Sequence, residues 1–246
     1  MQTIQQVSWN TYAQKYDMLL SYNPFYQQLH EQVLAEVKKW AIETGDRIAD
    51  IGAGTGNYSV AIAKHFPQAT VLHLDKDEGM NAVAAAKKER TGLTNLLIHG
   101  EGIEEAKLPE GSLRGLVCIH ALYTFPDPGA ALEKMYRALQ PGGYALLVDA
   151  GRIVDVLSWK LAIGWHLFKN YGVKKMLDIM QEGKEVSQQN AYIRQMQREG
   201  TFWTHSHEEF CAKVALAGFE IVSSHVTFRG VSDFVVAVRG ERLGRG

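Results

Sequence analysis

The chain has 246 residues, of which 46% are hydrophobic and 22% charged, and its formal net charge is −1 at pH 7. These proportions are those of an ordinary globular protein, and the near-neutral charge argues against a general attraction to nucleic acid or to an anionic membrane. Cys118 and Cys211 lie in apolar periodic segments, which predicts buried free thiols and no disulfide or zinc site. The polar amino terminus lacks the apolar core of a signal peptide, and no run of about 18 apolar residues occurs. We therefore expect a cytoplasmic protein without a membrane span.

The first part of the chain predicts helices, and the middle predicts alternating strands and helices. Helices are expected over 9–20 and 24–42, and residues 1–44 are expected to form a helical lid on a single domain spanning 1–246. The following strands are predicted at 47–51, 70–74, 96–99, 113–120 and 144–149. The helices between them are predicted at 58–65, 79–91 and 129–139. Such alternation indicates βαβ units and a mostly parallel sheet with helices on both faces.

The last part of the chain differs in pattern. Residues 151–204 have helical periodicity and many aromatic side chains, and an insertion of this length predicts a roof over the substrate. Trp165, His166 and Trp203 are its candidate substrate contacts. A helix over 206–217 then precedes strands at 219–228 and 232–239, whose short link requires antiparallel pairing. The expected fold is a Rossmann-like, doubly wound α/β sheet of seven strands, mostly parallel with an antiparallel terminal strand.

The most informative motif is Asp-Ile-Gly-Ala-Gly-Thr-Gly at positions 50–56, between a predicted strand and a predicted helix. Glycines at 52, 54 and 56 allow positive φ and let backbone approach a ligand, and the helix behind them presents unpaired N–H groups. The motif lacks a Walker lysine and differs from the G-x-G-x-x-G spacing of dinucleotide sites. Asp50 would also repel a pyrophosphate, whereas it could orient a cationic or polar ligand.

Two later strand ends carry groups that suit an adenosine. Asp75 ends the second strand, where an acidic residue accepts hydrogen bonds from ribose hydroxyls in nucleotide-binding α/β folds. Glu101, Gly102 and Ile103 follow the third strand and offer a carboxylate, a backbone N–H and an apolar side chain. These three groups suit the amino group, a ring nitrogen and the face of an adenine.

With these motifs in this order, the chain resembles the class I S-adenosylmethionine-dependent methyltransferases of the small-molecule type, over about residues 45–149. The resemblance implies that the 50–56 loop holds the methionine moiety of S-adenosylmethionine and that S-adenosylhomocysteine is the product. It further implies a fifth strand after Pro141-Gly142-Gly143, and Gly115 stands where the family often has an aspartate. The implied cofactor-binding residues are Tyr16, Asp50, Gly52, Gly54, Gly56, Asp75, Lys76, Met80, Glu101, Gly102, Ile103 and His120, and no metal site is implied.

Methyl transfer from a sulfonium is an in-line displacement, so a protein mainly aligns donor and acceptor and excludes water. An acceptor that must lose a proton can need a general base at the strand ends. Tyr123 after the fourth strand and Asp149 at the end of the fifth are the catalytic candidates. The expected function is methylation of a small, apolar or aromatic acceptor on oxygen, nitrogen or carbon. Methylation of a peptide or amino-acid side chain and a non-catalytic cofactor-binding module are the alternatives, and the sequence leaves the oligomeric state open.

Overall fold

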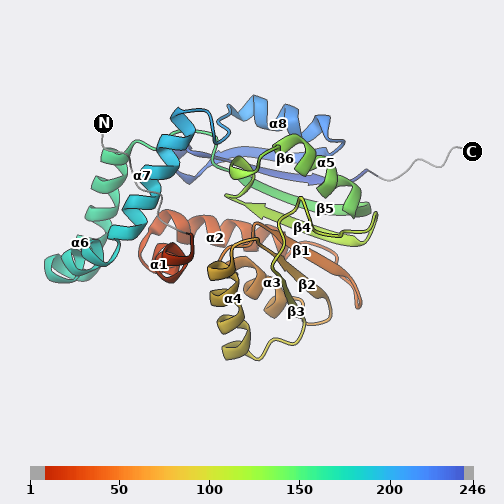
Figure 1. The fold of residues 1–246 in the computed structure, drawn as a ribbon, viewed down its shortest axis with the longest axis horizontal. Helices are drawn as coiled ribbons and strands as arrows, with labels where there is room; N and C mark the ends of the chain where they lie inside the picture. The colour runs from red at the N-terminus through yellow and green to blue at the C-terminus, as the bar shows by residue number, and fades with distance from the viewer. Residues whose placement is uncertain (1–8, 241–246) are drawn as a thin grey trace, which may run out of the picture.

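The computed structural model describes residues 9–240, without the side chains of residues 9–12 and 14. The amino-terminal residues tested for a signal peptide and the tail after Gly240 therefore lie outside the described part of the chain. Seven strands form one sheet in the order β3-β2-β1-β4-β5-β7-β6 (Figure 1). They are β1 Arg47–Ile51, β2 Thr70–Leu74, β3 Leu96–His99, β4 Leu113–Ile119, β5 Leu139–Asp149, β6 Glu220–Thr227 and β7 Ser232–Val238.

The strand pairing confirms the predicted Rossmann-like sheet. The first five strands pair in parallel, whereas β7 runs antiparallel to both of its neighbours, β5 and β6. The antiparallel strand therefore lies one position inside the edge of the sheet, and β6 forms the edge itself. The carboxyl ends of β1, β2 and β4 meet where the strand order reverses, which is the usual ligand position in such sheets.

Helices cover both faces of the sheet. Helices α2 and α3 contribute to the core on one face, and α5 and α8 contribute to the core on the other. The long insertion forms α6 and α7, which lie beside α1 at one end of the molecule (Figure 1). The helices are α1 Trp9–Tyr22, α2 Pro24–Val37, α3 Asn57–His65, α4 Glu78–Thr91, α5 Pro128–Ala138, α6 Val156–Glu182, α7 Lys184–Arg198 and α8 His207–Leu216. None of the helices in the described part of the chain is both long and apolar enough to cross a membrane.

Most boundaries agree with the expectation to within two residues, whereas two of them, the end of α2 and the start of β5, differ by five. Helix α2 ends at Val37, and Trp40 turns back onto the sheet, where a Cβ on Gly115 would meet its ring at 2.6 Å. This contact explains why glycine stands at position 115. Strand β5 begins at Leu139 rather than 144, because Leu139 already pairs with Leu113 of β4 and the Gly142 N–H donates to the Arg239 carbonyl at 2.7 Å.

Candidate functional site

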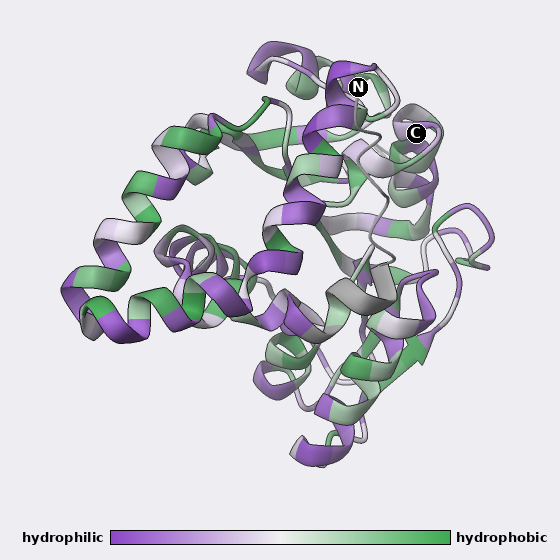
Figure 2. Cartoon of the chain, turned by 60° about the vertical axis from the view of Figure 1, so that its left-hand side comes forward, coloured by the Kyte–Doolittle hydropathy of each residue, from purple (hydrophilic) through white to green (hydrophobic). Residues whose placement is uncertain are grey.

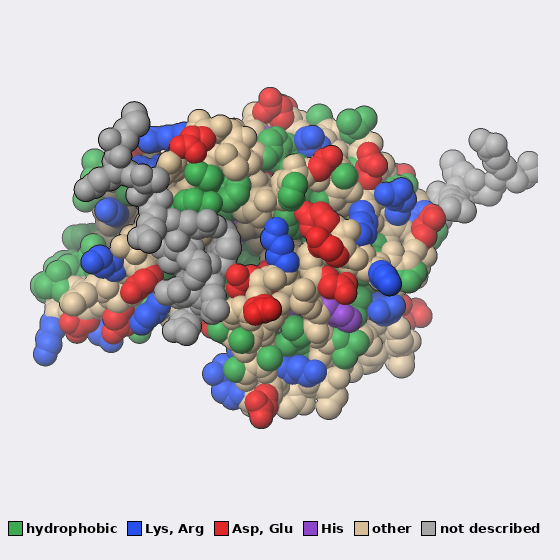
Figure 3. Space-filling model, in the orientation of Figure 1, with side chains coloured by type: hydrophobic (Ala, Val, Ile, Leu, Met, Phe, Trp, Pro, Cys, Tyr) green, Lys and Arg blue, Asp and Glu red, His purple; other side chains and the backbone are tan. Residues whose placement is uncertain are grey.

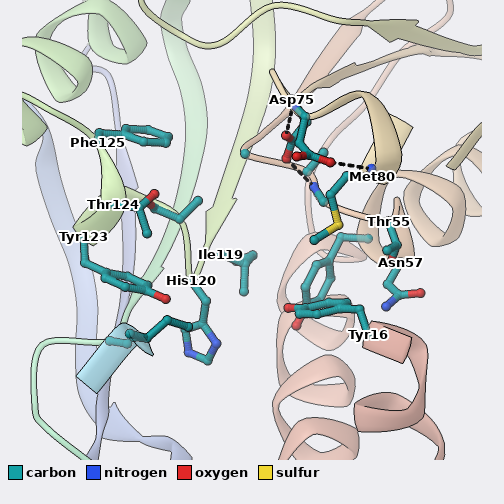
Figure 4. Close-up of a pocket in the computed structure, with 18 of the residues that line it drawn as sticks. Tyr16, Thr55, Asn57, Asp75, Met80, Ile119, His120, Tyr123, Thr124 and Phe125 are labelled. Carbon is teal, nitrogen blue, oxygen red and sulfur yellow. Dashed lines mark hydrogen bonds between the residues drawn. The ribbon is translucent and has the colours of Figure 1, made fainter. Parts of the chain in front are cut away.

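A cavity of about 360 Å³ lies at the carboxyl ends of the parallel strands. Its lining comes from the loops after β1, β2, β3, β4 and β5 and from helices α1, α2 and α7. Figure 4 shows the two walls: Tyr123, Thr124 and Phe125 face Tyr16 and Met80 across the open space. The volume lies within the range of ~300–1,000 Å³ usual for small-molecule sites.

The glycine loop after β1 forms the floor of this cavity. Gly52, Gly54 and Gly56 all have positive φ, at +66°, +56° and +78°, so the loop takes a path that other residues rarely adopt. A Cβ on Gly52 would lie 2.3 Å from the Cβ of Ala121, which leaves no room for a side chain. Gly52 and Gly54 line the cavity as expected, but Gly56 does not. Its missing Cβ instead lets α3 pack against Ala84 of α4, since that Cβ would sit 3.0 Å from the alanine Cβ.

Asp75, at the end of β2, organises the loop from the side. Its carboxylate accepts hydrogen bonds from the Gly54 N–H at 2.8 Å and from the Asp77 N–H at 2.9 Å (Figure 4). Burial raises the pKa of this carboxyl above its ordinary value, and the two N–H donors partly offset that effect. An ionised carboxylate has about four acceptor positions. Two hydrogen bonds to the backbone therefore leave capacity for ligand hydroxyls at the same group.

Asp50 is buried at the floor and belongs to a chain of hydrogen bonds. The Ser59 hydroxyl donates to Asp50 at 2.6 Å and also lies 3.0 Å from His73 Nδ1, while His73 Nε2 lies 2.9 Å from Asn81 Oδ1. The other end of Asn81 donates to the backbone carbonyl of Asp75 at 2.8 Å. Burial raises the pKa of Asp50 to about 7 and lowers that of His73 to about 4. The charge of the cavity floor therefore changes near pH 7, where the Asp50 carboxyl loses its proton.

The loop after β3 reaches the cavity with a different carboxylate from the one expected. Lys76, Met80, Gly102 and Ile103 line the cavity as expected, whereas Glu101 is exposed outside it. Ile103 is 1% exposed and anchors the loop in the core, and the turn that follows brings Glu104 to the lining. The alternation of apolar and polar residues in this loop did not indicate which glutamate faces inward, so Glu104 was missed.

Helix α1 is fastened over the glycine loop by a buried lysine. Lys87 Nζ of α4 donates to Asp17 at 2.8 Å, to Thr55 at 3.2 Å and to Asn57 at 2.7 Å. The Thr55 hydroxyl donates to the same aspartate at 2.8 Å. Tyr16, the neighbour of Asp17, is thereby held at the cavity wall. The sequence indicated Tyr16 but not the lysine that fixes its helix.

The end of β4 contributes a strained histidine and a tyrosine. His120 has φ +53°, which is uncommon for a residue with a side chain and often marks a functional position. Its Nε2 lies 2.8 Å from the hydroxyl of buried Ser232, and burial lowers its pKa to about 4, so the ring is neutral. Tyr123 also lines the cavity, and burial, with Tyr26 and Asp149 nearby, raises its pKa. The phenol therefore keeps its proton.

Asp149 lies behind the cavity wall rather than in it. Its Oδ1 accepts the backbone N–H of Tyr123 at 3.1 Å, and its Oδ2 lies 3.2 Å from His205 Nε2. The other ring nitrogen of His205 lies 3.2 Å from Asp233, which also binds both terminal nitrogens of Arg152, at 2.6 and 2.9 Å. The neighbouring carboxylates raise the pKa of His205 to about 9 although burial opposes this. This buried ionic cluster fixes the loop that carries Tyr123, and the sequence did not indicate its histidine.

The three expected substrate contacts do not line the cavity. Trp165 is exposed and His166 half-buried on α6, and Trp203 packs on the His205 ring with centroids 4.3 Å apart. Helix α7 and the loop after it supply the roof instead. The cavity-lining residues of that roof are Asn190, Tyr192, Ile193, Gln197 and Phe202. The aromatic content of 151–204 indicated a roof, but α6 is apolar on more than one face, so its inward face could not be identified.

No group of three or more His, Cys, Asp or Glu side chains within residues 9–240 is arranged to hold a metal ion. The cavity has a floor of glycine backbone and aromatic side chains in its walls. It also has a buried carboxyl, Asp50, with a pKa of about 7, and a second carboxyl, Asp75, with free acceptor positions for hydrogen bonds. This set fits a nucleoside with a cationic side chain.

Comparisons with known proteins find similar methyltransferases. Residues 48–143 match a family model described as a methyltransferase domain. A demethylmenaquinone methyltransferase of Listeria welshimeri is 30% identical over 148 residues, which are 59% of this chain and 61% of that protein. The trans-aconitate 2-methyltransferase of Deinococcus radiodurans is 37% identical over 97 residues, 39% of this chain and 35% of that protein. The matched region thus spans about three fifths of the length of the Listeria relative and about one third of the length of the Deinococcus relative.

The fold has solved counterparts as well. A SAM-dependent methyltransferase from Aquifex aeolicus superposes with a TM-score of 0.61 at 17% sequence identity, covering 94% of this chain and 98% of that one. At this identity the likeness shows the shared fold.

Proposed function

We propose that this chain is a class I S-adenosylmethionine-dependent methyltransferase and that it transfers the methyl group to a small, apolar or aromatic acceptor held under α7. The observation that carries the proposal is one continuous cavity, in which the glycine loop and Asp75 lie at one end and aromatic side chains at the other. The relative from Listeria is named for demethylmenaquinone, which is consistent with an acceptor of this class.

Each group near the glycine loop would contact a different part of the cofactor. Asp75 would accept the ribose hydroxyls, and Met80 and Ile103 would pack on the adenine. Asp50 and the loop backbone would face the methionine moiety, in which the sulfonium and the ammonium are cationic and the carboxylate is anionic. Tyr16 and His120 would enclose it. S-adenosylmethionine supplies the electrophilic methyl group, and the chain's own residues orient the acceptor and exclude water.

The acceptor end of the cavity is apolar with few polar groups. Tyr26, Tyr192, Phe202 and Phe228 line it, and Asn190 and Gln197 supply amides for hydrogen bonds. Arg152 is bound to the buried Asp233, so its charge is already neutralised. An apolar ring bearing a polar substituent matches this lining better than a strongly charged acceptor does.

The protonation states assign different roles to the two catalytic candidates. Tyr123 keeps its proton, so its hydroxyl acts as a donor that orients the acceptor and not as a general base. Asp149 does not line the cavity and acts through the Tyr123 backbone N–H as a positioning residue. Where the acceptor must lose a proton, neutral His120 at the cavity wall is the group placed to receive it.

Tyr123→Phe is expected to lower kcat/KM by roughly tenfold to a hundredfold, the value of a hydrogen bond to a developing charge. The dissociation constant of S-adenosylmethionine should remain unchanged, because the hydroxyl serves the acceptor. Transfer of labelled methyl groups to a panel of hydroxylated aromatics and quinols measures the effect, with peptides as the alternative acceptors. Tyr136→Phe, whose ring packs on Phe219 away from the cavity, is the control. Methylation of peptides but of no small aromatic acceptor would contradict the proposal, as would an equal loss of kcat/KM in Tyr123→Phe and Tyr136→Phe.

The affinity for S-adenosylmethionine is expected to rise by up to roughly tenfold between pH 6 and pH 8. Burial holds the pKa of Asp50 at about 7, so the group is mainly a neutral acid at pH 6 and a carboxylate at pH 8. Only the carboxylate attracts the cationic ligand, and binding should release a proton. Calorimetric titrations in buffers of different ionisation enthalpy measure both effects. In Asp50→Asn the pH dependence should vanish, and its persistence would remove Asp50 as the cause.

A further inference from the structure

Helix α6 carries a stripe of large apolar side chains that face away from the protein. Leu157, Leu161 and Trp165 are 69%, 67% and 66% exposed, and Phe168 is 44% exposed. Their spacing of three and four residues places all four on one side of the helix. We call this set the α6 stripe. Figure 2 shows apolar residues recurring along this projecting helix.

The opposite side of α6 already satisfies the packing needs of the fold. The Trp159 ring lies 5.1 Å from Phe25 and 4.8 Å from Phe228, and Leu167 is buried. After a break at Gly172 (φ 75°, ψ 171°), the helix again exposes apolar residues, including Leu177. The α6 stripe is therefore not part of the core, and an apolar face of this size at the surface indicates an interaction site.

The charges around the α6 stripe are predominantly positive. Helix α6 itself contains four lysines and two acidic residues, whereas the whole chain has a net charge of −1. Helical spacing places Lys160 on one flank of the α6 stripe and Lys169 on the other. Figure 3 shows lysine, arginine and some acidic side chains beside apolar ones at this end of the molecule.

We propose that the α6 stripe docks on a lipid bilayer with anionic headgroups. An amphipathic helix with leucine and aromatic residues on one face and lysines at its margins lies in the plane of such an interface, with the apolar face among the acyl chains. Aromatic side chains such as Trp165 favour the level of the headgroups. A second copy of the chain fits less well, because pairing two identical faces would bring their flanking lysines together.

The position of α6 gives this docking a consequence for the cavity. The helix follows Val154, which lines the cavity, and leads into α7, whose Tyr192 lines it from above. A bilayer held against the α6 stripe would therefore lie next to the roof. An apolar acceptor could then pass from the bilayer to the cavity, a consequence that rests on the proposed function. Docking itself does not depend on the identity of the acceptor.

Sedimentation of the full chain with vesicles tests the docking without any methyl acceptor. The chain should bind vesicles of phosphatidylcholine containing one part in four of phosphatidylglycerol, and binding should weaken as salt is added. Trp165→Glu should reduce the partition coefficient by at least roughly tenfold, from the loss of apolar burial and the added repulsion. Lys169→Glu should reduce it by several-fold. Leu216→Glu, at an 88% exposed position of α8, and Lys38→Glu on the exposed end of α2 are the matched controls.

Binding that is lost in the α6 variants and kept in both controls supports the proposal. Absence of binding to the anionic vesicles overturns it, as does equal binding by Trp165→Glu and the unchanged chain. A dimer in light scattering that Trp165→Glu dissociates, without vesicle binding, would assign the α6 stripe to a second copy instead. Methyl transfer to a water-soluble acceptor, measured without vesicles, tests the proposed function separately, so the two can fail independently.

Discussion

Asp75→Ala should weaken the binding of S-adenosylmethionine by roughly tenfold to a hundredfold, because hydrogen bonds to a charged group are worth about 1.5–3 kcal/mol. The variant removes the acceptor proposed for the ribose hydroxyls. It also removes the acceptor that holds the Gly54 N–H at 2.8 Å, so the glycine loop loses part of its support. Isothermal titration of the purified variant gives the dissociation constant directly.

Asp127→Ala is the control for this variant. Asp127 accepts the Ala130 N–H at 3.0 Å as the amino-terminal cap of α5, outside the cavity lining. Its loss should cost stability of about 1 kcal/mol and leave the cofactor affinity unchanged. Cofactor affinity that falls equally in both variants would show a general effect of destabilisation and not the loss of a ribose contact.

His205→Ala should lower the free energy of unfolding by about 3–5 kcal/mol, the usual cost of removing one partner of a buried ionic cluster. The imidazole lies 3.2 Å from both Asp149 and Asp233, and neither carboxylate is accessible to water. Without the ring, Asp149 is buried with no cationic neighbour and the loop of Tyr123 loses its support. Urea denaturation followed by circular dichroism measures the change. His207→Ala is the control, because this partly exposed ring bonds to Asp233, Ser224 and Cys211 but not to Asp149, and Arg152 still neutralises Asp233.

The same cluster predicts how stability depends on pH. His205 has a pKa raised from 6.5 to about 9, so its stabilising contribution is complete below 6.5 and is lost as the pH rises through 9. Asp233 has a pKa lowered from 3.8 to about 2, so its contribution is present above 3.8 and is lost as the pH falls through 2. In His205→Ala the loss at high pH should disappear. An unchanged pH profile in that variant would show that another group causes it.

The fold and the donor end of the cavity followed from short-range patterns in the sequence. Strand ends and glycines can be recognised from neighbouring residues alone. The strand-to-helix turn has positive φ at Gly52 and Gly54, a conformation that glycine favours whatever the rest of the fold. Asp75 was predicted for the same reason, since its position at the end of β2 fixes where its carboxylate lies. The seven-stranded sheet followed from the alternation of strands and helices.

The residues at the acceptor end could not be predicted, because their arrangement depends on contacts between residues far apart in the sequence. Asp149 was identified as a strand-end carboxylate, but His205, 56 positions later, turns it away from the cavity. Glu101 and Glu104 are both exposed acidic residues beside the buried Ile103, and the path of the loop places only Glu104 in the cavity lining. The choice between α6 and α7 as the roof likewise required knowing which apolar face packs on Phe25 and Phe228.

Equilibrium dialysis of the unmodified chain with labelled S-adenosylmethionine tests the central claim most directly. We expect one saturable site per chain, from which S-adenosylhomocysteine displaces the label and excess NAD does not. Failure to retain the label, or its displacement by NAD, would contradict the assignment of the glycine loop and Asp75 to this cofactor.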